Sequence, residues 1–254
     1  LDTAIEVVRN LKMGTDSNPD LLTVSLSSFD MLGHNFGPYS AEMMDATFRL
    51  DRALAKFFGD LKKVLPEGLK DVVFILTADH GIQINPRHGE SLRLPDHIFW
   101  SEAVEEELLK DIENEFGISA KVDVIAEFQE GHIFLDYAKL KSKKAKPEDV
   151  ASFIVKRLRS HPAFVEIHSI FDLMNGNFRP SPVAIKIARS VRNGRSGDVQ
   201  YTLAAGYVPL YKNTTEGNDH ESATVQDGHI PIIFSGKGIH KGVYFNPAYL
   251  QDIA

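Results

Sequence analysis

The sequence contains no cysteine, one tryptophan and no excess of basic residues. Without cysteine there can be no disulfide and no thiolate ligand, so a bound metal would have to be held by histidine and carboxylate groups. The 28 Lys and Arg against 35 Asp and Glu give a formal net charge of −7. This balance argues against a nucleic-acid polymer as partner, because such proteins usually carry a basic patch. No apolar run approaches the roughly 20 residues needed to cross a bilayer, so we expect no membrane span.

The length and composition are those of an ordinary globular protein. A chain of 254 residues can bury a sizeable core, either as one large α/β domain or as a domain with an inserted lobe. Residues 1–8 resemble the body of an amphipathic helix, and residues 251–254 carry no helix-closing signal. We therefore expect both ends to have been cut from a longer protein.

Three short apolar runs, residues 21–26, 72–76 and 230–234, predict strands. The first carries branched and apolar residues on both faces, which is typical of a strand covered by helices on both sides. Between the first two runs, Ser40 is a plausible N-cap for a long helix that ends near residue 65. Strand, helix and strand in this order indicate a parallel crossover unit. We predict an α/β fold with a mostly parallel sheet flanked by helices.

The pattern changes after Gly81, and we expect residues 88–195 to form a smaller inserted α+β lobe. The core metal-binding domain would then consist of residues 1–87 and 196–254, with residues 198–203 returning to the main sheet. Within the lobe we predict helices at 102–116, 147–159 and 182–192, a strand pair within 122–136 turned near Glu130, and a strand at 165–168.

The polar residues that follow the first two runs are candidate metal ligands. Asp30 and His34 are four residues apart, which places both side chains on one side of a helical turn, close enough to share an ion. The alternative is a helix-capping Asp beside a surface His. Asp79 and His80 leave a buried strand, and Gly81 permits a backbone turn that lets both act as ligands. The carboxyl end of a parallel strand is where open α/β sheets bind ligands, whereas the alternative is a loop Asp that caps the next element.

The third candidate position is His220, in a polar loop ahead of residues 230–234. An exposed loop histidine is the alternative, and His229 is a competing candidate. The other histidines have no comparable context and we expect them to be non-catalytic: His88, His97, His132, His161, His168 and His240.

Together these segments resemble the alkaline phosphatase superfamily, in particular its branch of single-chain alkaline phosphatases and type I phosphodiesterases or nucleotide pyrophosphatases. The order of the motifs, Asp-x-x-x-His, then Asp-His-Gly, then a lone His before a strand, is more specific than any one of them. The matching segments are residues 27–38 (SSFDMLGHNFGP), 76–81 (LTADHG), 194–198 (GRSGD), His220 and 227–232 (DGHIPI).

The resemblance implies a role for each candidate. Asp30, His34 and His220 resemble the ligands of one zinc ion, and Asp79 and His80 resemble two ligands of a second. His229 would instead steer its strand into the sheet. The implied activity is hydrolysis of small phosphate esters, as in alkaline phosphatase-type phosphomonoesterases, at a two-zinc site. The resemblance also implies a periplasmic or extracellular location.

The nucleophile of the family has no match here. The resemblance places that Ser or Thr, together with a further metal-binding Asp, well upstream of Asp30, and no preceding segment resembles it. We therefore expect no catalytic residue within this chain and little activity from the chain alone. Phosphodiesterase or nucleotide pyrophosphatase activity, sulfate or phosphonate hydrolysis, and an inactive binding module on the same scaffold are the alternatives. A plain α/β domain with scattered histidines would require a coincidence across four segments.

Overall fold

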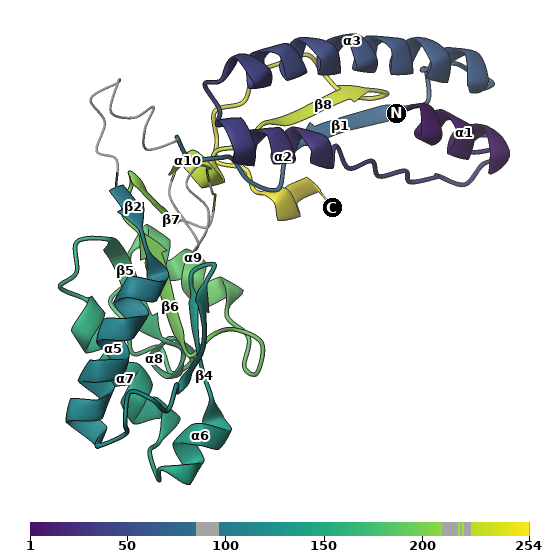
Figure 1. Ribbon diagram of the computed structural model, residues 1–254. Helices are drawn as coiled ribbons and strands as arrows, with labels where there is room; N and C mark the ends of the chain where they lie inside the picture. The colour runs from purple at the N-terminus through teal and green to yellow at the C-terminus, as the bar shows by residue number, and fades with distance from the viewer. Residues whose placement is uncertain (85–96, 210–217, 219, 221–224, 254) are drawn as a thin grey trace. The chain divides into compact units, whose positions relative to one another are not determined.

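The computed structural model describes residues 1–84, 97–209, 218, 220 and 225–253 (Figure 1). The chain divides into two compact units, which are described separately. Unit 1 comprises Leu1–Gly81 and His229–Ala254, and unit 2 comprises Ile82–Gly228. The predicted lobe at residues 88–195 stays a proposal. Among the described residues, no helix is both long and apolar enough to span a membrane.

Unit 1 is built from helices around a two-stranded ribbon. Its elements are α1 (Asp2–Asn10), α2 (Ser27–Phe36), α3 (Ala41–Val64), β1 (Val73–Thr77), β8 (Ile232–Gly236) and the 3-10 helix η1 (Leu250–Ile253). The predicted cap is present, because the Ser40 side chain accepts a hydrogen bond from the Met43 backbone N–H. Phe57 and Leu61 of α3 are buried in a small core with α1. Phe74 of β1 extends this core, since its ring packs edge-on against the ring of Phe58.

The predicted strand at residues 21–26 is wrong, because this segment has no strand structure and leads directly into α2. A strand needs a neighbouring backbone to pair with, and an apolar pattern alone does not supply one. Leu21 is 86% exposed in this segment. The predicted parallel crossover is also wrong, because it requires a strand at residues 21–26. β1 instead pairs antiparallel with β8, and Ile75 lies opposite Phe234.

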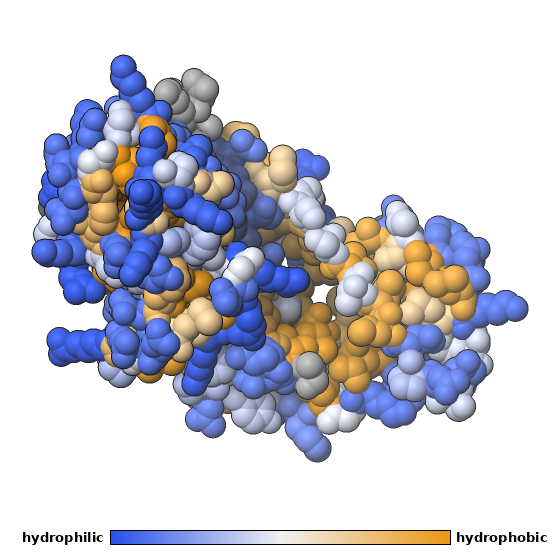
Figure 2. All heavy atoms as spheres, turned by 90° about the horizontal axis from the view of Figure 1, so that it is seen from below, coloured by the Kyte–Doolittle hydropathy of each residue, from blue (hydrophilic) through white to orange (hydrophobic). Residues whose placement is uncertain are grey.

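The expected burial of β1 is also not observed. Val73, Ile75 and Leu76 are all exposed, because in the part of the chain that is described the sheet of unit 1 has only two strands. Figure 2 shows hydrophobic side chains gathered on the surface on the unit 1 side of the view.

Unit 2 contains a four-stranded antiparallel sheet in the order β3-β4-β6-β5. Its strands are β3 (Ile125–Gln129), β4 (His132–Leu135), β5 (Phe164–Ser169) and β6 (Val199–Leu203), and a parallel pair joins β2 (His97–Phe99) to β7 (Tyr207–Pro209). Its helices are α5 (Ser101–Phe116), α6 (Tyr137–Ser142), α7 (Pro147–Leu158), α8 (Ile170–Met174), α9 (Pro182–Ser190) and α10 (Val225–Gly228). The core packs α5 and α7 onto the sheet, with Leu108, Ile133, Ile154 and Val199 fully buried.

Most of the predicted elements of the lobe are confirmed. Helices α5, α7 and α9, the hairpin of β3 and β4, and strand β5 lie within a few residues of the predicted positions. The prediction that residues 198–203 return to the main sheet is wrong, because β6 is an inner strand of the four-stranded sheet and all five of its residues are buried. The mostly parallel sheet is likewise wrong. The structure is mixed α/β, and in its described part only β2 and β7 pair in parallel.

Candidate metal centre

Asp30 and His34 lie one turn apart on α2, as the sequence predicts. The His34 Nε2 atom is 3.5 Å from the Asp30 Oδ1 atom. Asp30 does not cap the helix, because the N-cap is Leu26 and no side chain caps this end. The His34 side chain is 34% exposed, so it is half-buried rather than a free surface group. The helix-capping role considered for Asp30 is therefore not what the structure shows, and the metal-ligand role of the pair stays a prediction.

Asp79 and His80 follow β1 and bring a second carboxylate and imidazole to the same place. The His80 Nε2 atom lies 3.9 Å from Asp30 Oδ1 and 3.6 Å from Asp79 Oδ2. The Asp79 carboxylate also accepts a hydrogen bond of 3.2 Å from the His80 backbone N–H. Asp30 and His34 of α2 thus form one cluster in unit 1 with Asp79 and His80, which follow β1.

The backbone of Gly81 selects the form of the His80 ring. The His80 Nδ1 atom lies 2.8 Å from the Gly81 carbonyl oxygen. A carbonyl can only accept, so Nδ1 carries the proton in the neutral ring and Nε2 is left with its lone pair. This is the arrangement in which a histidine is held ready as a metal ligand, with its second nitrogen bonded to an outer partner. The sequence indicated the turn at Gly81 but not this hydrogen bond.

The donor set fits a zinc ion. Ligand atoms at the usual Zn–N and Zn–O distances in a tetrahedral site are roughly 3.4 Å apart, close to the 3.5 Å separation of His34 and Asp30 and the 3.6 Å separation of His80 and Asp79. Carboxylate oxygen and imidazole nitrogen are ligands that zinc accepts readily. The carboxylates of Asp30 and Asp79 also bring negative charge to this cluster, which favours a divalent cation.

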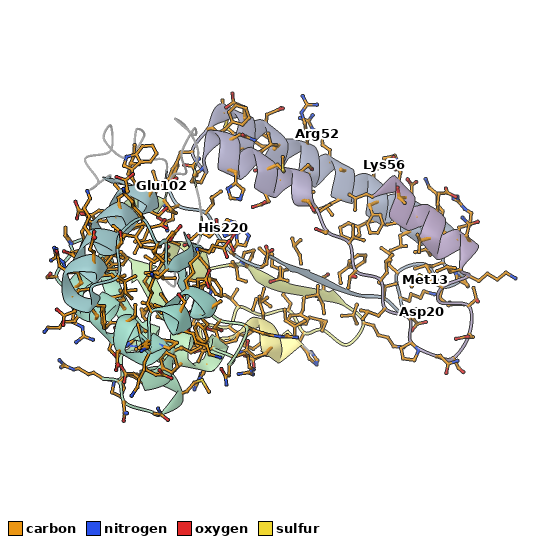
Figure 3. All side chains as sticks on the ribbon, turned by 60° about the horizontal axis from the view of Figure 1, so that its bottom comes forward. Met13, Asp20, Arg52, Lys56, Glu102 and His220 are labelled. Atoms are coloured by element: carbon orange, nitrogen blue, oxygen red, sulfur yellow. The ribbon has the colours of Figure 1, made fainter. Side chains whose placement is uncertain are left out.

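His220, which is labelled in Figure 3, belongs to unit 2, and its assignment to the same ion as Asp30 and His34 stays a prediction. Residues 219 and 221–224 lie outside the described residues. The competing candidate His229 is exposed and precedes β8 in unit 1.

The remaining histidines have other surroundings. His168 is buried, and its Nε2 atom lies 2.7 Å from the Glu166 carboxylate. Burial lowers the pKa of His132, and the His161 ring packs edge-on against Phe164. His97 lies in β2 and His240 is exposed, whereas His88 falls outside the described residues.

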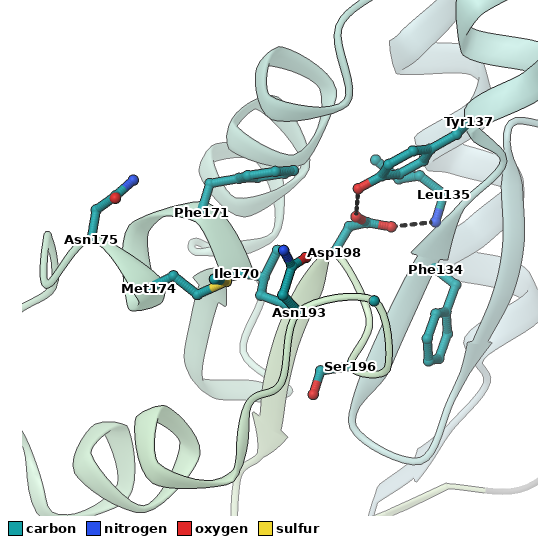
Figure 4. Close-up of a pocket in the computed structure, with 11 residues that line it drawn as sticks. Phe134, Leu135, Tyr137, Ile170, Phe171, Met174, Asn175, Asn193, Ser196 and Asp198 are labelled. Carbon is teal, nitrogen blue, oxygen red and sulfur yellow. Dashed lines mark hydrogen bonds between the residues drawn. The ribbon is translucent and has the colours of Figure 1, made fainter.

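A pocket in unit 2 is a second place where polar groups gather, and it contains Asp198 of the matched GRSGD segment (Figure 4). The buried Asp198 carboxylate accepts hydrogen bonds from the Leu135 backbone N–H at 2.8 Å and from the Tyr137 hydroxyl at 2.5 Å. Burial and the bond to Asp198 raise the pKa of the Tyr137 phenol. Both carboxylate oxygens thus bind protein donors, so Asp198 holds the end of β4 against the start of β6.

The fold and the Asp and His cluster define a mixed α/β protein with a candidate metal centre at a strand end. Residues 2–228 match the family model of type I phosphodiesterase / nucleotide pyrophosphatase. Because this match covers most of the chain, the protein belongs to that family, within the alkaline phosphatase superfamily.

Known relatives agree with this assignment. The chain is 31% identical to alkaline phosphatase PafA of Elizabethkingia meningoseptica, over all of this chain and 45% of that protein. It is 32% identical to alkaline phosphatase PhoV of Synechococcus elongatus, over 96% of this chain and 42% of the relative. The crystal structure of wild-type PafA superposes with a TM-score of 0.83 at 29% identity, over 95% of this chain and 44% of that one. The chain thus spans less than half the length of these relatives.

Proposed function

We propose that this chain supplies the metal-binding part of a phosphate-ester hydrolase of the alkaline phosphatase type. The observation that carries the proposal is the approach of His34 and His80 to Asp30, together with the approach of Asp79 to His80. The two predicted zinc sites keep their assignments: Asp30, His34 and His220 for one ion, and Asp79 and His80 for the other. When bound, zinc polarises phosphoryl oxygens and lowers the pKa of an attacking hydroxyl.

In this proposal the residues of the chain hold the metal ions and balance their charge, and none of them attacks the phosphate ester. Asp30 and His34 are fixed by one helix, and His80 by the Gly81 carbonyl, so the ligands need little rearrangement to receive a cation. The hydroxyls of Ser27 and Thr77 have local partners: Ser27 Oγ lies 2.9 Å from Ser25 Oγ, and Thr77 Oγ1 donates to the Ala78 carbonyl oxygen at 3.4 Å. We assign none of them as nucleophile and propose that a Ser or Thr outside the matched span of the relatives fills this role.

The substrate is proposed to be a small phosphate monoester, because the matched relatives are named alkaline phosphatases. The family description, type I phosphodiesterase / nucleotide pyrophosphatase, favours diesters or pyrophosphates as the second candidate. Sulfate and phosphonate esters are a related possibility with the same site chemistry. An inactive binding module is disfavoured by the presence of all the unit 1 ligands. A periplasmic or extracellular location and the lack of a nucleic-acid partner complete the proposal.

Zinc titration tests the ligand assignment directly. We expect the metal-free chain to bind zinc, and His34→Ala to weaken binding more than His80→Ala, because the first ion has its full predicted set of Asp30, His34 and His220. Each substitution should lower the zinc affinity by at least about tenfold. Loss of a residue that only hydrogen-bonds a metal ligand already lowers metal affinity by about 10- to 100-fold. Isothermal titration calorimetry measures these affinities, and His229→Ala, an exposed histidine in unit 1, is the matched control.

The pattern of losses separates the two assignments. If His220→Ala weakens the site as much as His34→Ala and leaves the His80 site intact, the predicted trio is supported. Equal losses in the His34 and His80 variants, or no zinc binding by the wild-type chain, would contradict the proposal. Zinc binding should weaken as the pH falls, because an imidazole must be neutral to act as a ligand.

Activity is tested in a chimera in which this chain replaces the matched segment of PafA. We expect zinc-dependent hydrolysis of p-nitrophenyl phosphate, and a fall in kcat/KM of at least about 100-fold in the His34→Ala chimera, since removal of one transition-state contact typically has such an effect. Comparison with bis(p-nitrophenyl) phosphate distinguishes the monoester from the diester candidate. A folded, zinc-loaded chimera that hydrolyses neither ester would overturn the proposed function.

A further inference from the structure

The cavity of unit 2 shown in Figure 4 is lined mainly by aromatic and aliphatic side chains. Its volume is about 360 Å³, within the range of roughly 300–1,000 Å³ that is usual for small-molecule sites. The rings of Phe134, Tyr137 and Phe171 line it together with the thioether of Met174. Aromatic rings from β4, from α6 and from α8 thus border one space that can hold a small organic molecule.

Among the described residues that line this cavity, Asp198 is the only one with a charged side chain. It is 7% exposed, and its hydrogen-bond donors, the Leu135 N–H and the Tyr137 hydroxyl, are both neutral. In the part of the chain that the structure describes, no Lys, Arg or His forms an ion pair with it. A buried charge is costly unless it is paired, and a carboxylate has lone pairs for more than two donors. The cavity therefore borders a carboxylate that has no counter-ion within the described chain.

Other charged groups of unit 2 near the cavity do not compensate Asp198. Burial raises the pKa of the Tyr137 phenol, and the negative charges of Asp198 and Glu148 raise it further. Arg192 and Arg195 belong to the loop that precedes Asp198, but neither lines the cavity. The Arg192 guanidinium instead donates to the backbone carbonyl of the preceding residue at 3.1 Å. The electrostatic environment of the cavity therefore favours a positively charged ligand.

We propose that this cavity binds a small methylated ammonium ion, with its charged group near the aromatic rings and the Asp198 carboxylate. The face of an aromatic ring attracts a cation through its negative electrostatic potential, and the carboxylate adds a full opposite charge. A methylated ammonium ion combines a positive charge with an apolar surface, which matches a lining that is apolar around one buried carboxylate. The inference rests on unit 2 alone and does not depend on the proposed hydrolysis of phosphate esters.

Neutral polar groups of the cavity indicate a polar substituent on the ligand. The exposed amides of Asn175 and Asn193 line the cavity, as does the Ser196 hydroxyl. The Ser196 oxygen accepts a hydrogen bond of 2.9 Å from the Arg192 backbone N–H, which leaves its own O–H available to donate. Such groups bind a hydroxyl or a carbonyl oxygen, so the expected ligand class is a methylated ammonium ion with a short polar chain.

A bare metal ion and an uncharged apolar molecule fit this cavity less well. Calcium takes roughly six to eight oxygen ligands, whereas more of this lining is apolar than polar. An uncharged apolar molecule would remove Asp198 further from water and still leave its charge without a partner, which is unfavourable.

Choline and its uncharged isostere 3,3-dimethylbutan-1-ol separate the effect of charge from the effect of shape. We expect the chain to bind choline in isothermal titration calorimetry and to bind the isostere at least about tenfold more weakly, because cation–aromatic attraction and the Asp198 charge act only on the cation. Methionine-methyl NMR locates the ligand. Of the five methionines of the chain, Met174 lines the cavity, and its resonance, assigned with Met174→Leu, should be the one that shifts.

Substitutions of the rings test the aromatic contribution. Phe134→Leu and Phe171→Leu each remove one ring and keep an apolar side chain, so each should weaken choline binding by at least about threefold with little effect on the isostere. Phe48→Leu, at a phenylalanine that is 57% exposed in unit 1, is the matched control. Asp198→Asn, which keeps the shape of the side chain but not its charge, should narrow the difference between the two ligands.

The ligand pair and the ring variants decide the matter even if Asp198→Asn fails to fold, which circular dichroism detects. Equal affinity for choline and the isostere, or no detectable choline binding, would overturn the proposal. Choline binding that leaves the Met174 resonance in place, or that is unchanged in both ring variants, would overturn it as well. Each of these results stands whether or not the protein hydrolyses phosphate esters.

Discussion

Replacing Gly236 by alanine is expected to remove more than about 4 kcal/mol from the free energy of unfolding of unit 1, a loss reserved for strong steric or core defects. Gly236 ends β8 with φ +117°, and a Cβ atom there would lie 2.1 Å from the Val72 carbonyl oxygen. That oxygen belongs to the backbone and accepts a hydrogen bond of 2.9 Å from the Lys237 N–H. It cannot move aside without breaking the register of the ribbon.

Urea denaturation followed by far-UV circular dichroism measures this effect, with hydrogen exchange of β1 as a local readout. Gly238→Ala is the matched control, because Gly238 has φ +77° but open space where a Cβ atom would lie. It should show only the backbone penalty of about 1–2 kcal/mol. If the two variants are destabilised equally, the steric account of Gly236 is wrong.

Replacing Asp198 by alanine is expected to cost unit 2 about 3–5 kcal/mol, because a buried carboxylate with two donors is lost and those donors remain without an acceptor. The Leu135 N–H and the Tyr137 hydroxyl both depend on this group. The substitution removes the tie between the hairpin of β3 and β4 and the inner strand β6. Trp100, the single tryptophan of the chain, lies in unit 2, so its fluorescence reports urea unfolding of this unit.

Tyr137→Phe is the matched control for Asp198, since it removes one of the two hydrogen bonds and leaves the carboxylate. We expect a loss of about 1.5–3 kcal/mol, typical of a bond to a charged group. The raised pKa of Tyr137 means that its contribution is complete below about pH 10 and is lost as pH rises above that value. The phenylalanine variant should lack this alkaline loss. A control as unstable as Asp198→Ala would show that the Leu135 bond contributes nothing.

Local signals in the sequence predicted helices and turns well. Ser40 caps α3, Pro147 and Pro182 open α7 and α9, and Glu130 lies in the turn between β3 and β4. Each of these signals acts within a few residues, so no distant contact can override it easily. Apolar periodicity is equally local, and it predicted the positions of strands β1 and β8.

Strand direction could not be predicted in the same way. The partner of β1 is β8, more than 150 residues later along the chain, and an apolar run carries no mark of its direction. The segment at residues 21–26 has the composition of a strand without a backbone partner in the described structure. β6 joined the sheet of unit 2 for a related reason, because a strand buried on both faces fits either sheet equally well by sequence.

The candidate site was predicted in its residues but not in its construction. The four-residue spacing of Asp30 and His34 is a property of one helix and follows from sequence alone. The sequence predicted Asp79 and His80 at the carboxyl end of a parallel strand, whereas in the structure His80 reaches Asp30 of α2 from the end of an antiparallel ribbon. The role of the Gly81 carbonyl depends on a backbone orientation that no residue pattern encodes.

The strand order of unit 2 has a consequence for synthesis on the ribosome. β6 lies between β4 and β5 but is made after both, some 30 residues beyond the end of β5. At translation rates of about 5–20 residues per second, the earlier strands wait for seconds with open edges before the strand that joins them emerges. During this interval the nascent chain is exposed to mispairing, so chaperone binding at β5 would have its greatest effect at this stage of translation.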